Sequence, residues 1–144
     1  MMHGLTKNSK WSICLSSTAS ASGGTDGLVL DRQNYESVVF FGSVVTTATD
    51  NGLDVYVSTS SSTAQGEPVK SSRATATSTA LLVDCAVLPP GKRYVYGSYR
   101  CGTATKKGAL IGVLYNPRKG AVDNATSTQA YTLCTSGSTG GATA

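Results

Sequence analysis

The chain has few of the residues on which catalysis and metal binding usually depend. Its 144 residues include a single histidine, His3, and four cysteines, none of which forms a Cys-x-x-Cys pair. A structural zinc site needs clustered cysteine and histidine ligands at short spacings, so the sequence predicts no metal site. The many serines lack a Gly-x-Ser-x-Gly motif and a nearby base, and the sequence has no Walker loop and no dinucleotide fingerprint. We therefore expect no enzymatic activity and no cofactor.

Charge is also scarce. Charged residues make up 14% of the chain, against roughly a quarter in an average domain, and eight of them are acidic. A carboxylate pair for glycoside hydrolysis could be drawn from Asp31, Glu36, Asp50, Asp54 and Asp84, which keeps a hydrolase as an alternative. Asp50 and Asp54 flank an Asn-Gly pair and could hold Ca²⁺, although the pattern of a calcium loop is missing. Neither interpretation is favoured, because eight acids make some such pairing inevitable.

Long hydrophobic runs are missing too. Residues 1–10 are polar, the apolar stretch 11–15 is too short for a secretion signal, and no run reaches membrane-spanning length. These features predict a chain that folds in a cytoplasm and has no membrane partner. In that compartment Cys14, Cys85, Cys101 and Cys134 are expected to be free thiols, with a Cys85–Cys101 disulfide as the alternative.

What the sequence does contain is a series of short apolar or alternating runs separated by Gly, Pro, Asn and Asp. No helical period lies between them, which indicates an all-β antiparallel sandwich. The continuous run Val38–Phe41 is typical of a strand covered on both faces, whereas residues 53–58 alternate between apolar and polar. Asn51-Gly52 predicts a type I′ hairpin turn. The expected strands lie at 28–31, 36–45, 53–60, 80–88, 93–100, 109–115 and 130–134, and residues 11–15 could form a further short strand.

Composition divides the chain into an extended, flexible N-terminal arm (residues 1–27), one β-sandwich domain (28–135) and a disordered tail (136–144). Ser, Ala, Thr and Gly dominate residues 16–27, which cannot bury enough apolar area to offset their ordering entropy. An arm that carries Trp11 beyond a flexible spacer is typical of docking on a neighbouring molecule. A plain disordered terminus is the alternative.

The net charge is +4, and the basic residues are scattered. They have no dense stripe of the kind that binds nucleic acid, so no nucleic-acid partner is expected. Solvated loop charge is the favoured interpretation, and contact with an acidic protein partner is the sharper one. The densest basic pairs lie beside Gly or Pro and are Lys92-Arg93, Lys106-Lys107 and Arg118-Lys119.

Tyrosines gather in one predicted strand. Tyr94, Tyr96 and Tyr99 share residues 93–100, and with Tyr56 they could form a flat face for a sugar or a protein. Core and cross-strand packing is the favoured interpretation of these rings.

The order of motifs over residues 28–118 is familiar. It runs from Leu30-Asp31 to Tyr-Glu-Ser-Val-Val-Phe at 35–40, then Asp-Asn-Gly at 50–52, Gly-Lys-Arg-Tyr-Val at 91–95, and Gly-Val-Leu-Tyr at 112–115 followed by Pro117-Arg118. This order resembles that of the head decoration, or cement, proteins of tailed bacteriophages, which have a jelly-roll fold. The resemblance covers the middle two thirds of the chain, and its motifs are short.

The resemblance implies a structural virion protein that assembles in the host cytoplasm, binds the exterior of the expanded head and bridges major capsid subunits as a homotrimer or homodimer. The chain departs from the family in its high Ser/Thr content and its four cysteines. A carbohydrate-binding module, or a receptor-binding tip domain of a tail fibre, is the alternative and would use the tyrosine face. The resemblance would assign capsid contacts to Trp11, Lys92, Arg93, Lys106, Lys107, Arg118 and Lys119.

Overall fold

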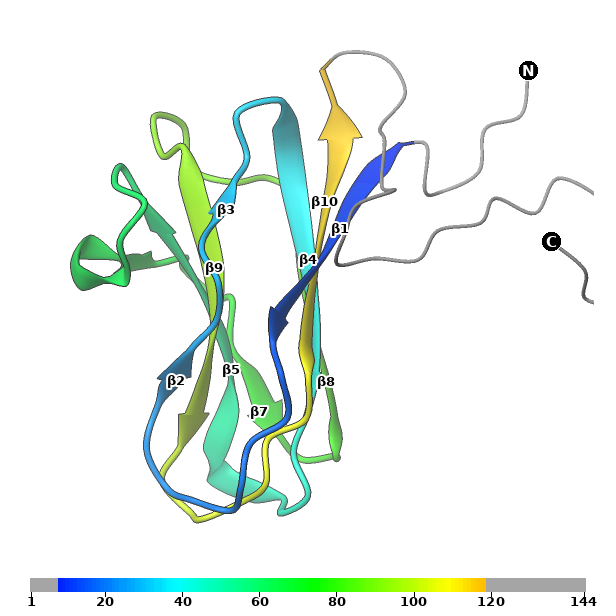
Figure 1. The fold of residues 1–144 in the computed structure, drawn as a ribbon, viewed down its shortest axis with the longest axis vertical. Helices are drawn as coiled ribbons and strands as arrows, with labels where there is room; N and C mark the ends of the chain where they lie inside the picture. The colour runs from blue at the N-terminus through cyan, green and yellow to red at the C-terminus, as the bar shows by residue number, and fades with distance from the viewer. Residues whose placement is uncertain (1–7, 119–144) are drawn as a thin grey trace, which may run out of the picture.

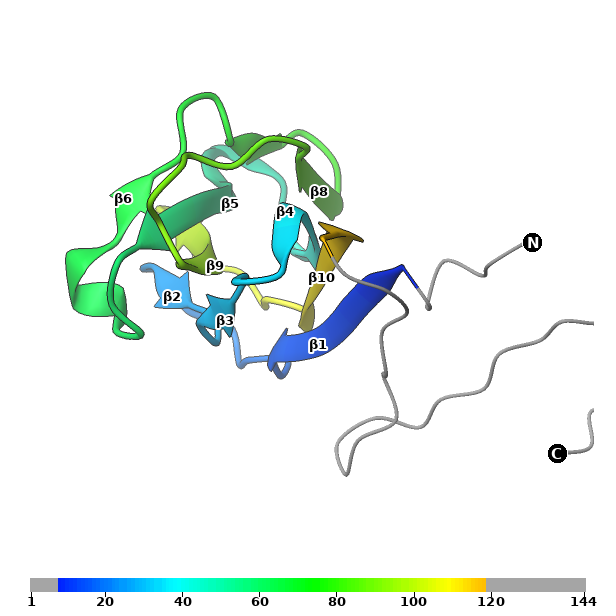
Figure 2. The same ribbon diagram turned by 90° about the horizontal axis from the view of Figure 1, so that it is seen from above.

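Two antiparallel β-sheets packed face to face make up the fold (Figure 1). The computed structural model describes residues 8–118. The first sheet has the order β1 (Ser9–Leu15), β10 (Leu110–Pro117), β4 (Tyr35–Ser43) and β8 (Ala80–Cys85). The second is built on β9 (Tyr94–Cys101) and β5 (Ala48–Ser58); β2 (Thr25–Asp26) and β3 (Leu30–Asp31) pair with β9, and β6 (Glu67–Pro68) and β7 (Ala74–Ala76) pair with β5. A short 3₁₀ helix, η2 (Thr63–Gln65), precedes β6, and Figure 2 shows the two layers from above.

The core lies between the two sheets, where the inward positions of the strands meet. Val38 and Phe40 of β4 are fully buried there, as are Leu53 and Val55 of β5. The alternation predicted for residues 53–58 is therefore confirmed on its apolar side. Burying each such side chain stabilises the fold by about 1.5–3 kcal/mol.

This architecture confirms the prediction of an all-β antiparallel sandwich. The jelly-roll connection stays a prediction. The strand expected at 130–134 and the tail expected at 136–144 lie outside the described residues. Within residues 8–118, no helix is long and apolar enough to cross a membrane.

The expectation of an N-terminal arm over residues 1–27 is wrong for the part that the structure describes. β1 pairs along its length with β10, with Trp11 opposite Val113. β2 pairs with β9 in the other sheet. This segment buries little apolar area, and backbone hydrogen bonds to neighbouring strands stabilise it instead. The sandwich therefore begins at Ser9 rather than at Leu28.

The hairpin turn predicted at Asn51-Gly52 is also wrong, because both residues lie inside β5. Gly52 pairs with Arg100 of β9, and a Cβ at Gly52 would lie 2.6 Å from the carbonyl oxygen of Ala74. Asn51 is buried and its Nδ2 donates to the carbonyl of Thr46. Glycine is needed at position 52 because β7 approaches closely there. A glycine in a strand and a glycine in a turn look alike in the sequence, so the pattern could not distinguish them.

Candidate functional site

The outward side of the first sheet is apolar, although the solvent side of an antiparallel sheet is usually polar. Strand register aligns its outward positions in two rows that cross the sheet. The first row is Ile13, Ile111, Phe41 and Leu82; the second is Trp11, Val113 and Val39, and it ends in Asp84 on β8. We call the seven apolar residues of these rows the outer face.

Three of the seven residues of the outer face are open to solvent, whereas Val113 is only 3% exposed. Ile13 and Leu82 are each 57% exposed and Phe41 is 39% exposed. The ring of Trp11 stacks on that of Phe41, with 6.4 Å between centroids and 7° between planes. The run Val38–Phe41 predicted a strand covered on both faces, yet residues 8–118 cover its inward side far more completely than its outward side. A contiguous exposed apolar patch of this kind marks an interaction site.

Trp11 was the predicted anchor of an arm, and the structure places it in the sheet instead. Its indole Nε1 donates to the hydroxyl of Ser9 at 2.7 Å. The residue keeps its candidacy as a contact, since it lies on the outer face. The sequence contains no signal for the outer face, because that face forms only when β1 pairs with β10.

One end of the sandwich gathers basic side chains from three segments. Arg32, Lys92, Arg93 and Arg118 line a hollow of about 280 Å³ whose lining contains no acidic residue. Three of these four were predicted contacts, and the structure brings them together, whereas Lys119 lies outside the described residues. Arg32 was missed, because an isolated arginine between two predicted strands gives no signal.

Lys92, Arg93 and Arg118 of this hollow each hold a carboxylate of their own chain. Lys92 pairs with Glu67 at 3.2 Å, Arg93 with Asp31 at 2.6 Å, and Arg118 with Glu36 at 3.4 Å. The hydrogen bonds from Arg93 are the main reason that the pKa of Asp31 is lowered. These pairs are exposed, so each stabilises the fold only slightly.

Arg32 is buried and has a structural role. Its guanidinium donates to the backbone carbonyls of Lys92 at 2.6 Å and Pro89 at 2.5 Å. Burial lowers the pKa of Arg32, and the nearby positive charge of Arg118 lowers it further. The side chain therefore fixes the loop before β9 and adds positive charge at this end.

The opposite end carries Lys106 and Lys107. Lys106 is exposed, but Lys107 is only 3% exposed. Both line a second hollow, of about 820 Å³, beside the turn after β4. The favoured interpretation of solvated loop charge does not fit Lys107, whose side chain is largely buried, and no local pattern shows which lysine of the pair turns inward.

The four tyrosines do not share one face. Tyr99 is fully buried between the sheets, where its hydroxyl accepts from the amide of Ser43 and donates to the carbonyl of Gly108. Tyr56 and Tyr96 stack across β5 and β9 with 5.3 Å between centroids. The guanidinium of Arg93 lies 5.5 Å from the ring centroid of Tyr94. A face of all four tyrosines is therefore wrong, because Tyr99 lies on the opposite side of β9 from Tyr94 and Tyr96. Core or cross-strand packing is confirmed for Tyr99 and for the stacked pair.

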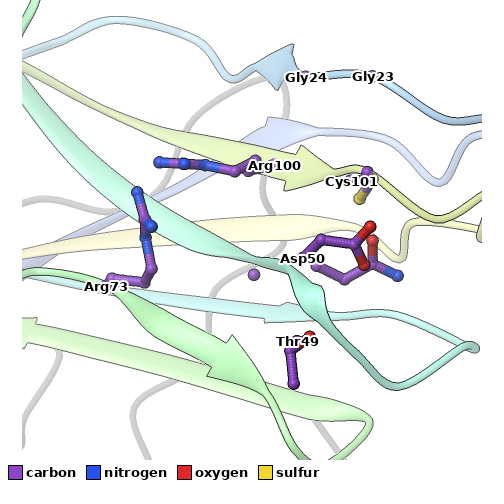
Figure 3. Close-up of a pocket in the computed structure, with 10 residues that line it drawn as sticks. Gly23, Gly24, Thr49, Asp50, Arg73, Arg100 and Cys101 are labelled. Carbon is purple, nitrogen blue, oxygen red and sulfur yellow. The ribbon is translucent and has the colours of Figure 1, made fainter.

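A third hollow, of about 310 Å³, lies beside Arg73, Arg100 and Asp50 (Figure 3). Both guanidiniums bond to the buried carboxylate of Asp54, at 2.9 Å from Arg73 and 2.6 Å from Arg100. Two cations already hold Asp54, so this carboxylate is unsuited to Ca²⁺. Among residues 8–118, no three His, Cys, Asp or Glu side chains gather in a way that could hold a metal ion.

The carboxylates of the hydrolase alternative are also engaged. Asp31 and Glu36 are ion-paired as described, and Asp84 accepts a hydrogen bond from the hydroxyl of Tyr115. That contact and burial together raise the pKa of Tyr115 to about 12, with burial as the larger cause.

The described cysteines are free and buried, which confirms the expected thiols at Cys14, Cys85 and Cys101. Burial raises the pKa of all three, in the case of Cys14 to about 11. Inert thiols in apolar surroundings are structural rather than reactive. Cys134 lies outside the described residues.

Comparison with known proteins adds nothing to this geometry: no protein-family model, no curated protein and no solved structure matches the chain.

Proposed function

We propose that this chain is a non-enzymatic structural protein of a tailed-phage virion, which binds the exterior of the head and bridges major capsid subunits. The observation that carries the proposal is the outer face, an apolar surface across all four strands of one sheet. A capsid subunit would cover it. The motif order over residues 28–118 supports the choice of partner and the jelly-roll connection.

The physical argument rests on repetition. A capsid offers the same site many times, so each copy needs only a modest interface, and bridging by a homodimer or homotrimer would convert weak contacts into avidity. Phe41, Ile13 and Leu82 supply apolar contact area near the centre and edges of the sheet. The basic hollow of Arg32, Lys92, Arg93 and Arg118 would add contacts to acidic groups at one end.

The carbohydrate-binding or tail-fibre alternative has less support. Its aromatic face needs open rings, and Tyr96 and Tyr99 are both buried. Sugar-binding sites use exposed aromatic rings, and the second sheet, which carries these tyrosines, offers few of them.

The test is attachment to expanded heads that lack the protein. The change is Leu82→Lys, which places a charge in the outer face at a position that is 57% exposed. We expect the free energy of unfolding to stay within about 0.5 kcal/mol, because the site is exposed. We expect attachment, measured by cosedimentation with heads, to weaken about tenfold or more, because a charge would be desolvated in an apolar contact.

Val87→Lys is the matched control. Val87 is 85% exposed and lies in the loop between β8 and β9, outside the outer face. It introduces the same charge and should attach like the wild-type chain. Equal attachment by Leu82→Lys and Val87→Lys would reject the outer face as the capsid contact, and no attachment by the wild-type chain would reject the proposed function.

A further inference from the structure

The hollow beside Lys107 holds polar groups that the fold does not satisfy. Lys107 lies in the loop between β9 and β10, where its backbone bridges Val44 and its carbonyl accepts from the amide of Thr18 at 2.9 Å. The residue alternates with Lys106, so one lysine is exposed and the next is buried. Three chain segments, the one after β1, the one after β4 and this loop, therefore meet at Lys107.

Two of these groups lack partners. Within residues 8–118, the ammonium of Lys107 makes no ion pair. Five other cations of this part of the chain each hold a carboxylate: Arg73, Lys92, Arg93, Arg100 and Arg118. The hydroxyl Oγ1 of Thr18 is buried and has no hydrogen-bond partner in the same part of the chain. Both residues line the hollow of about 820 Å³.

The lining of this hollow has the chemistry of an anion site. Lys106 adds a second cation, and no acidic residue contributes to the lining. Lys107 is only 3% exposed and makes no ion pair within the described residues, and leaving the buried hydroxyl of Thr18 unpaired is costly, so an oxyanion in the hollow could pair with both. Ser17, Ser43 and Thr79 line the same space, and their hydroxyls could donate to the remaining lone pairs of that anion.

The position of the hollow indicates where the anion comes from. Ser43 lies two residues after Phe41 in β4 and pairs with Ala80, so it continues the outward side of the same sheet. The hollow therefore borders the outer face. A protein docked on that face could reach Lys107 with an acidic side chain.

We infer that this hollow binds a carboxylate, supplied by an acidic side chain of the protein that docks on the outer face. The source of the carboxylate rests on the proposed function, whereas the anion site itself does not. Nucleic-acid phosphates are a poorer match, because the basic residues of this chain form separate clusters rather than a stripe.

The first experiment uses the isolated full chain and sodium acetate as the probe. Amide shifts of Thr18 and Lys107 are followed by NMR during a titration at constant ionic strength, and saturable shifts are expected. Lys107→Met keeps the aliphatic stem and removes the charge, and it should weaken acetate binding about tenfold or more. Lys70→Met is the matched control, because Lys70 is exposed and lies outside this hollow, and it should bind acetate like the wild type.

Thr18→Val gives a second readout that does not depend on the lysine. Valine fills the same volume without the unsatisfied hydroxyl, so the thermal midpoint should hold or rise while acetate binding weakens. A fall in both would mean that Thr18 has a structural role only and would count against the site. Shifts that never saturate, or that are the same in Lys107→Met, would overturn it.

Head attachment separates this inference from the proposed function. If the inference holds, Lys107→Met attaches to heads more weakly than Lys70→Met does. Acetate binding without any attachment of the wild-type chain would reject the capsid partner and keep the anion site. Acetate binding with undiminished attachment of Lys107→Met would reject the carboxylate contact with the capsid.

Discussion

At the scale of single residues, most buried polar groups of this sandwich find partners on another strand. Asp54 of β5 is held by Arg73 and by Arg100 of β9, and the hydroxyl of Tyr99 joins Ser43 to Gly108. Such groups are costly when they are left unpaired, so these contacts fix the positions of the segments that carry them. Among the described residues the buried hydroxyl of Thr18 departs from this pattern, which is why it enters the inference above together with Lys107.

The buried thiol of Cys14 predicts a pH dependence of stability. Burial raises its pKa in the fold to about 11 from the ordinary 9.0. Below pH 9 the thiol is protonated in both states and has no effect; between pH 9 and 11 the unfolded chain ionises first, and the fold loses stability. The loss by pH 11 should be about 2 kcal/mol more in the wild type than in Cys14→Ala.

The measurement is urea unfolding of both proteins at pH 8 and pH 11 under reducing conditions. Cys14→Ala should start less stable, because a buried side chain is truncated, but that offset does not depend on pH. Other titrating groups, Tyr115 among them, affect both proteins alike. An equal loss in the two proteins would show that Cys14 ionises as readily in the fold as in the unfolded chain.

The sequence could name candidate residues but not their surroundings. Lys92, Arg93 and Arg118 were found because basic pairs beside Gly or Pro stand out, and the structure gathers them. Arg32 could not be found, and Lys107 could not be distinguished from Lys106. Burial of a loop lysine depends on strands that are distant in the chain, and no local pattern records it.

At the scale of elements, periodicity predicted most of the long strands, placed β1 in an arm and missed most of the short strands. β4, β5, β8, β9 and β10 have enough residues to show an apolar period. β3 lies inside the strand expected at 28–31, whereas β2, β6 and β7 have two or three residues each and exist because a neighbour offers hydrogen bonds. The local signal of Asn51-Gly52 was overridden in the same way, by the pairing of β5 with β9 and β7.

Removal of residues 1–15 should therefore unfold or strongly weaken the sandwich. β1 makes ladder bonds to β10 and contributes Cys14 to the core, so its loss exposes both an edge and an apolar site. We expect a loss of about 3 kcal/mol or more in the free energy of unfolding. Removal of residues 1–7 keeps every described strand and serves as the control in the same urea titration. Equal stability of the two truncated chains would mean that β1 behaves as the free arm that the composition predicted.

At the scale of the whole molecule, apolar and basic surfaces occupy different places. The outer face covers one side of the sandwich, Arg32 and its basic neighbours lie at one end, and Lys106 and Lys107 lie at the other. Net charge is +4. A partner that covers the outer face would meet positive charge at both of its ends, so apolar contact would set most of the affinity and charge would set the orientation.

Salt separates these two contributions. Screening shortens the range of charge interactions from about 10 Å at 0.1 M to about 3 Å at 1 M and leaves apolar contact in place. Attachment of the wild-type chain to heads should therefore weaken only partly over this range, by about tenfold. Lys107→Met should begin weaker at low salt and change less, because it has already lost a charged contact. Complete release of the wild-type chain at high salt would mean that charge holds the complex, and the outer face would then be exposed for another reason.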